Sequence, residues 1–178
     1  MKLSQSLQLL FVFMLALAHG WRAGALEVAT ESGLVRGLEK PDHHLFLGVP
    51  YGESMGGAGR WLPLEPVRPW TEVREANMFG SICPQQKVGQ AVGDDNCLFL
   101  NVTIPIVQAN ETSGEFPVMV WIHGGAHVQG AGSEYGAELL AVKGRVVVVT
   151  LNYRLGAFGF ASLPGFSGSG GRISAETG

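Results

Sequence analysis

Two apolar runs, joined by a glycine-rich turn and a short helical stretch, constrain the fold most strongly. Residues 118–122 contain no polar side chain, a pattern typical of a strand that is buried on both faces in a parallel sheet. This run ends in His123-Gly-Gly125, and a second apolar run covers residues 146–151. Residues 137–143 predict a helix between them, with Gly144 as its C-terminal cap. Strand, turn, helix and strand make a βαβ unit, whose polar crevice forms where the strands end.

Composition and charge limit the classes of partner. The chain has 178 residues, 46% of them hydrophobic, which suits one domain with a real core. Its net charge is −3 and its basic residues are scattered, which argues against nucleic acid or an anionic membrane surface as a partner. His43 and His44 are adjacent, so on a strand they would face opposite sides and could not share a metal ion. We expect no metal and no cofactor.

The N-terminus has the pattern of a secretory signal. Lys2 precedes an apolar block at residues 9–18, which is too short to cross a bilayer comfortably. Ala23-Gly-Ala25 then fits the small-residue pattern of a cleavage site, although a cut nearer Ala18 or Gly20 also fits. We therefore expect a signal peptide over residues 1–25, a mature chain over 26–178 and an extracellular location.

Two cysteines and a sequon agree with secretion. Cys83 and Cys97 are an even pair in an oxidising compartment, which predicts a disulfide that closes a surface loop. Asn110-Glu-Thr112 is a glycosylation sequon in a polar stretch. Asn101-Val-Thr103 also matches, but it lies inside an apparent strand, so we expect it to stay unmodified.

The remaining elements are read from local patterns. Residues 26–30 and 33–37 predict a hairpin with Glu31-Ser32 at its turn. Residues 45–49 predict a strand that Pro50 stops, and residues 97–104 predict another. The stretch from 52 to 70 is rich in glycine and proline and predicts irregular coil.

Four motifs in order carry a family resemblance. They are Phe46-x-Gly-Val-Pro-Tyr51, Cys97-Leu-x-Leu-Asn-Val102, Val120-Trp-Ile-His-Gly-Gly125 and Asn152-Tyr-Arg-Leu-Gly156. In this order they resemble the N-terminal part of the type-B carboxylesterase and cholinesterase family. The resemblance implies an α/β-hydrolase fold with a mixed, mostly parallel central sheet, of which this chain would be the N-terminal portion. It also implies a small-molecule carboxylic ester as substrate and a serine that becomes acylated.

The resemblance gives the glycine turn a role. Ester hydrolysis passes through a tetrahedral oxyanion, which preorganised backbone N–H groups stabilise. The N–H groups of Gly124, Gly125 and Ala126 would form this oxyanion hole. The family often has a third glycine where this chain has Ala126; a backbone donor survives the change, so we expect it to cost little. His123 is expected to fix the turn rather than to transfer protons.

The catalytic triad is not expected within this sequence. Gly52-Glu-Ser-Met-Gly56 matches G-x-S-x-G, but a nucleophile elbow needs a strand before the serine and a helix after it. Pro50 and the following glycines oppose both, so Ser54 is interpreted as a chance match. The elbow is expected downstream of Gly156 and beyond residue 178, followed by the triad acid and histidine. His127 lies near the turn, but nothing in the sequence pairs with it.

Two main hypotheses for function remain open, beside a third in which the chain is only a secreted decoy fragment. The first is a secreted carboxylic ester hydrolase to which this chain supplies the oxyanion hole, inactive on its own. The alternative is a non-catalytic extracellular binding or adhesion protein of the same fold.

Two positions depart from the family pattern. At Asn96 an acidic residue is usual, and after Phe160 the sequence no longer follows the family. On its own, the chain should leave apolar strand edges uncovered.

Overall fold

The computed structural model describes residues 26–54, 56–107 and 115–161. The expected signal peptide over 1–25 and the sequon at Asn110 lie outside these ranges. The elements are β1 (Glu27–Thr30), β2 (Gly33–Arg36), β3 (Leu38–Glu39), β4 (His43–Pro50), η1 (Gly57–Trp61), β5 (Arg74–Glu75), β6 (Gln85–Lys87), β7 (Gln90–Val92), β8 (Phe99–Pro105), β9 (Val118–Ile122), η2 (Gly132–Glu134), α2 (Glu138–Gly144), β10 (Val147–Leu151) and α3 (Gly156–Phe160). None of the helices in the described ranges is long and apolar enough to cross a membrane.

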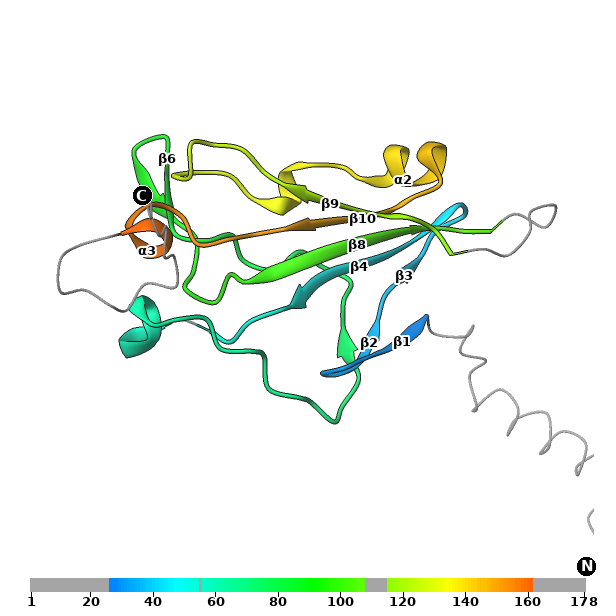
Figure 1. Cartoon of the computed structure of the whole chain (residues 1–178), viewed down its shortest axis with the longest axis horizontal. Helices are drawn as coiled ribbons and strands as arrows, with labels where there is room; N and C mark the ends of the chain where they lie inside the picture. Colours follow the sequence, from blue (N-terminus) through cyan, green and yellow to red (C-terminus); the bar gives the residue numbers. More distant parts are fainter. Residues whose placement is uncertain (1–25, 55, 108–114, 162–178) are drawn as a thin grey trace, which may run out of the picture.

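The main sheet has five strands in the order β3-β4-β8-β10-β9 (Figure 1). Strands β9 and β10 pair in parallel through the crossover that contains α2, which confirms the predicted βαβ unit. The pairs β3–β4, β4–β8 and β8–β10 are antiparallel. The sheet is therefore mixed, as expected, but these residues do not show its mostly parallel character. The chain reverses direction between β8 and β9, so β9 runs opposite to β8. Because the crossover makes β10 parallel to β9, β10 also runs opposite to β8.

Strand β9 forms an edge of this sheet, which corrects the expectation that both of its faces are buried. Its five side chains are between 47% and 66% exposed. Helix α2 contacts β4, β8 and β10, and no described strand pairs with the outer edge of β9. The apolar side chains of residues 118–122 would be buried only if another segment packed over them, and the described residues leave them exposed. The expected uncovered apolar edge is therefore present.

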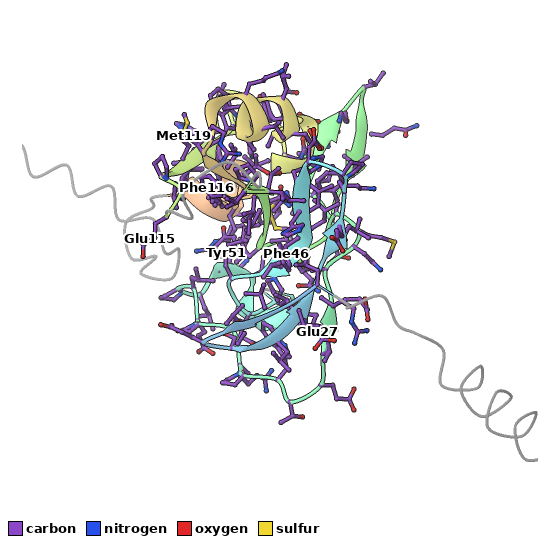
Figure 2. The ribbon with its side chains drawn as sticks, turned by 90° about the vertical axis from the view of Figure 1, so that its right-hand side faces the viewer. Glu27, Phe46, Tyr51, Glu115, Phe116 and Met119 are labelled. Atoms are coloured by element: carbon purple, nitrogen blue, oxygen red, sulfur yellow. A yellow bond between two sulfur atoms is a disulfide. The ribbon has the colours of Figure 1, made fainter. Side chains whose placement is uncertain are left out.

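A small sheet packs below the main one. Strands β1 and β2 form the predicted hairpin, and β5 joins β2 in parallel. Val35 of β2, Phe46 of β4 and Ala76 form a buried cluster that joins the two sheets, and Figure 2 shows Phe46 between them. Met119 of β9 lies on the other side of the molecule from this hairpin (Figure 2). The uncovered strand and the small sheet are thus at opposite ends of the structure.

Helix α2 ends one residue later than predicted. Gly144 is its last helical residue, and Arg145 is the cap, with φ 56° in the left-handed region. The N–H groups of Arg145 and Val146 both donate to the carbonyl of Ala141. The Arg145 guanidinium donates to the carbonyl of Ile106 at 3.0 Å and lies 4.9 Å from the centre of the Phe116 ring. These contacts offset the steric cost of a left-handed arginine, so glycine is not needed there.

Candidate active site

The glycine turn follows β9 and folds back on itself. The N–H groups of Val128 and Gln129 both donate to the carbonyl of Gly125, at 3.1 and 3.2 Å. Gly125 has φ 119°, and a Cβ there would lie 1.9 Å from the Gln129 oxygen. The tight turn therefore requires glycine at this position.

The amides at the start of this turn have no hydrogen-bond acceptor in the described part of the chain. The N–H groups of Gly124, Gly125 and Ala126 donate to no other residue of the described chain, and Gly124 and Ala126 are exposed. A cavity of about 280 Å³ adjoins Gly124 and Gly125, and the ion pair between Lys87 and Glu134 lies at its wall. The turn thus presents hydrogen-bond donors at the carboxyl end of β9, where open α/β sheets place their ligands.

Two consecutive residues of the turn that are not glycine have positive φ angles, in the left-handed region. Ala126 has φ 54° and His127 has φ 62°. For an alanine this conformation costs about 1–2 kcal/mol. The departure from the family's third glycine is therefore more costly than the sequence suggested. His127 is held by its carbonyl, which accepts the N–H of Gly156 at 2.6 Å, and by ring stacking on Phe160.

His123 fixes the start of the turn. Its side chain is 2% exposed, and Nδ1 lies 2.8 Å from the carbonyl oxygen of Gly124. Since a carbonyl only accepts, Nδ1 carries the hydrogen in this contact. The ring stacks on Tyr153 with 4.4 Å between centroids. His123 therefore has a structural role here, and no described group is placed to exchange a proton with it.

The predicted disulfide is confirmed and lies beside the turn. Cys83 and Cys97 are bonded and almost fully buried. The loop that they close contains the hairpin of β6 and β7. Gln85 of this hairpin forms hydrogen bonds to Gly130, a contact that no local sequence pattern predicts.

Asn152, the first residue of the Asn-Tyr-Arg-Leu-Gly motif, is a second support of the site. Its side-chain Nδ2 donates to the carbonyls of Ser81 and Cys97, and its Oδ1 accepts the N–H of Gly132. Its own carbonyl accepts the hydroxyl of Tyr51 at 2.6 Å. Burial raises the pKa of Tyr51 to about 12. One buried amide thus ties the end of β10 to the disulfide loop and to the segment after the turn.

Ser54 is exposed and lies in coil between β4 and η1. No described side chain forms a hydrogen bond to its hydroxyl, and the element that follows is the short 3₁₀-helix η1 rather than an α-helix. Its neighbour Glu53 pairs with Arg68, whose hydrogen bond lowers the pKa of that carboxyl. The local structure is not a nucleophile elbow.

Other charged side chains form ion pairs away from the turn, and Arg36 binds both Glu27 and Glu75. His43 Nδ1 lies 2.6 Å from Asp42 Oδ1, and Asp95 forms a bidentate pair with Arg60. Asp95 therefore supplies an ion pair beside Asn96, the position where the family's usual acid is missing. Within the described ranges, no three His, Cys, Asp or Glu side chains gather as metal ligands would.

Comparison with known proteins adds a family. A family model described as "Carboxylesterase family" matches residues 24–171. The chain is 42% identical over 149 residues to the para-nitrobenzyl esterase of Bacillus subtilis (strain 168), an alignment that covers 79% of this chain and 30% of that protein. It is 38% identical over 163 residues to an acetylcholinesterase of Bungarus fasciatus, covering 81% and 26%. A solved structure of PNB esterase superposes with a TM-score of 0.73 at 42% identity, covering 82% of this chain and 31% of that one. The chain thus spans less than a third of the length of these relatives.

Proposed function

The chain belongs to the carboxylesterase family, and on that premise we propose that it is the N-terminal part of a secreted serine ester hydrolase, to which it contributes the oxyanion hole. The observation that carries the proposal is the set of N–H groups at Gly124, Gly125 and Ala126, for which the described residues supply no acceptor. They lie at the end of β9 on a turn whose shape is fixed by its own hydrogen bonds and by Tyr153.

These amides suit the chemistry of ester cleavage. Attack on a carboxylic ester places negative charge on the former carbonyl oxygen, and fixed donors stabilise that charge more than they stabilise the substrate. Removing one such donor costs about 3–4 kcal/mol of barrier in comparable sites. The substrate class we propose is a small-molecule carboxylic ester.

The nucleophile is proposed to lie outside these 178 residues. Ser54 is the serine of the one G-x-S-x-G match in the sequence; it lies in exposed coil rather than at an elbow, and no described residue serves it as a base. We therefore expect residues 26–178 alone to hydrolyse no ester.

Secretion is supported by the disulfide. Disulfides of this kind persist in oxidising compartments and are rare in the cytosol. The signal-like segment at 1–25 and the sequon at Asn110 agree with this location, and modification at Asn110 remains part of the proposal.

The experiment uses a fluorophosphonate probe, which labels activated serines. The natural protein, captured from its source with an antibody against residues 115–161, should be labelled on a serine in a Gly-x-Ser-x-Gly sequence outside residues 1–178. Recombinant residues 26–178 and their Ser54→Ala variant should both remain unlabelled and inactive on nitrophenyl esters.

Each other outcome is informative. Labelling of Ser54, or activity that disappears in the Ser54→Ala variant, would refute the assignment of the nucleophile. A natural protein that carries another residue at the expected serine and takes no label would instead support the non-catalytic binding or adhesion function.

A further inference from the structure

The hairpin of β6 and β7 carries a glutamine that faces the glycine turn. Gln85 is the first residue of β6 and lies two positions after Cys83, within the loop closed by the disulfide. Its side chain is buried, at 8% exposure, whereas its neighbour Gln86 is exposed. A glutamine is rarely buried unless its amide is hydrogen-bonded.

The Gln85 amide is bonded through both its oxygen and its nitrogen. Its Oε1 accepts the N–H of Gly130 at 2.8 Å, and its Nε2 donates to the carbonyl of Gly130 at 3.0 Å. Nε2 also donates to the carbonyl of Cys83 at 3.0 Å. The side chain therefore binds both backbone polar groups of one residue, much as a neighbouring strand would, and is itself anchored beside the disulfide.

Gly130 is where the turn meets His123. A Cβ on Gly130 would lie 2.4 Å from His123 Nδ1, so the glycine backbone packs directly against the imidazole. Holding Gly130 in place therefore keeps the ring of His123 in its position over Tyr153. The segment from Gly124 to Gln129 is thus held at both ends, by Tyr153 at His123 and by Gln85 at Gly130.

We propose that Gln85 is a positioning residue, which fixes the free amides of residues 124–126 by binding both backbone groups of Gly130. This inference depends on the proposed function for its catalytic meaning, because Gln85 touches none of the three amides. The disulfide keeps Gln85 within reach, since both ends of its hairpin are tied at Cys83 and Cys97.

The test measures amide hydrogen–deuterium exchange by mass spectrometry on the full chain. In the Gln85→Leu variant, peptides covering residues 124–131 should exchange at least tenfold faster at the amides that are hydrogen-bonded within the turn, those of Val128 and Gln129. Peptides from β8 and β10 should keep their rates. Gln85→Asn retains the amide but is one methylene group shorter, so it should loosen the turn as Leu does.

Two further variants separate positioning from general loss of structure. Gln86→Leu changes the exposed neighbour on the same strand and should leave the rates for 124–131 unchanged. Gln85→Glu retains an acceptor for the Gly130 N–H but loses the donor, so its rates should lie between those of the wild type and Gln85→Leu.

Unchanged turn exchange in a folded Gln85→Leu or Gln85→Asn variant would overturn the inference. So would an equal increase across β8 and β10, or failure of all three Gln85 variants to fold, since each would show that Gln85 supports the whole fold rather than the turn. Because exchange does not depend on ester hydrolysis, failure of the probe experiment would refute the proposed function and leave this result standing.

Discussion

Tyr153 donates its hydroxyl hydrogen bond to the carbonyl oxygen of His123 at 2.8 Å, while its ring stacks on the imidazole of the same residue. Asn152, which follows β10, and its neighbour Tyr153 therefore support two different parts of the site. Tyr153 holds the start of the glycine turn, and Asn152 holds the disulfide loop and the N–H of Gly132. The Asn-Tyr pair has a structural explanation that does not require contact with a substrate.

We predict that Asn152→Asp destabilises the fold strongly. A carboxylate cannot donate, so the carbonyls of Ser81 and Cys97 would lose a partner and face a buried negative charge. The free energy of unfolding in urea, followed by tryptophan fluorescence, should fall by about 3 kcal/mol or more.

The matched control is Asn101→Asp. Asn101 is similarly buried, but its Nδ2 donates to the hydroxyl of Thr150, which can rotate and donate instead. Its loss of stability should be clearly smaller. Equal losses for the two variants would contradict the assignment of Asn152 as the central donor.

Ala126→Gly should stabilise the chain. The φ of 54° costs alanine more than it costs glycine, even after the greater freedom of glycine in the unfolded state is counted. We expect a gain of about 1 kcal/mol in the free energy of unfolding. Ala137→Gly serves as the comparison, since Ala137 has φ −98° and no such strain. This variant should show no gain in the free energy of unfolding.

Removing the disulfide should cost about 3 kcal/mol of stability, the value that the chain-entropy model gives for a loop of this size. The separation of Cys83 and Cys97 is 14 positions. The variant with both cysteines changed to alanine should unfold at lower urea concentration than the oxidised wild type. Dithiothreitol should shift the wild type towards this variant and leave the variant itself unaffected.

Tyr51 should make the fold sensitive to alkali. Burial raises the pKa of its hydroxyl from 10.0 to about 12, so the folded state retains a proton that the unfolded state releases. Stability from this group is therefore complete below pH 10 and is lost as the pH rises towards 12. Unfolding in urea at a series of pH values should show this decline.

In Tyr51→Phe the decline between pH 10 and 12 should be weaker, although the variant also loses the hydrogen bond to the Asn152 carbonyl at every pH. A slope identical to that of the wild type would show that other groups cause the alkaline loss.

Local signals in the sequence predicted the parts of the fold that depend on neighbours along the chain. The hairpin around Glu31-Ser32, the strand at 118–122 and the cysteine pair all follow from short patterns. The cap of α2 was predicted one residue early, because the contacts that hold Arg145 come from Ile106 and Phe116.

The supports of the site could not be read in the same way. Gln85 is separated from Gly130 by 45 positions, and Asn152 from Ser81 by 71. No periodicity relates such residues, so only the folded structure shows that they meet. The burial of β9 was overestimated for a related reason, since an apolar run indicates that a strand requires cover and does not identify the segment that provides it.

The strand order also determines when β9 can enter the sheet during synthesis of the chain. Strand β10 is made after β8 and β9, yet it lies between them. While the polypeptide is being translated, Val118–Ile122 can therefore join no ladder of this sheet until Val147–Leu151 has emerged and been inserted. Throughout that interval the hydrophobic segment 118–122 is unpaired and can associate with non-native strands. We therefore expect the nascent chain to need a chaperone most at this stage.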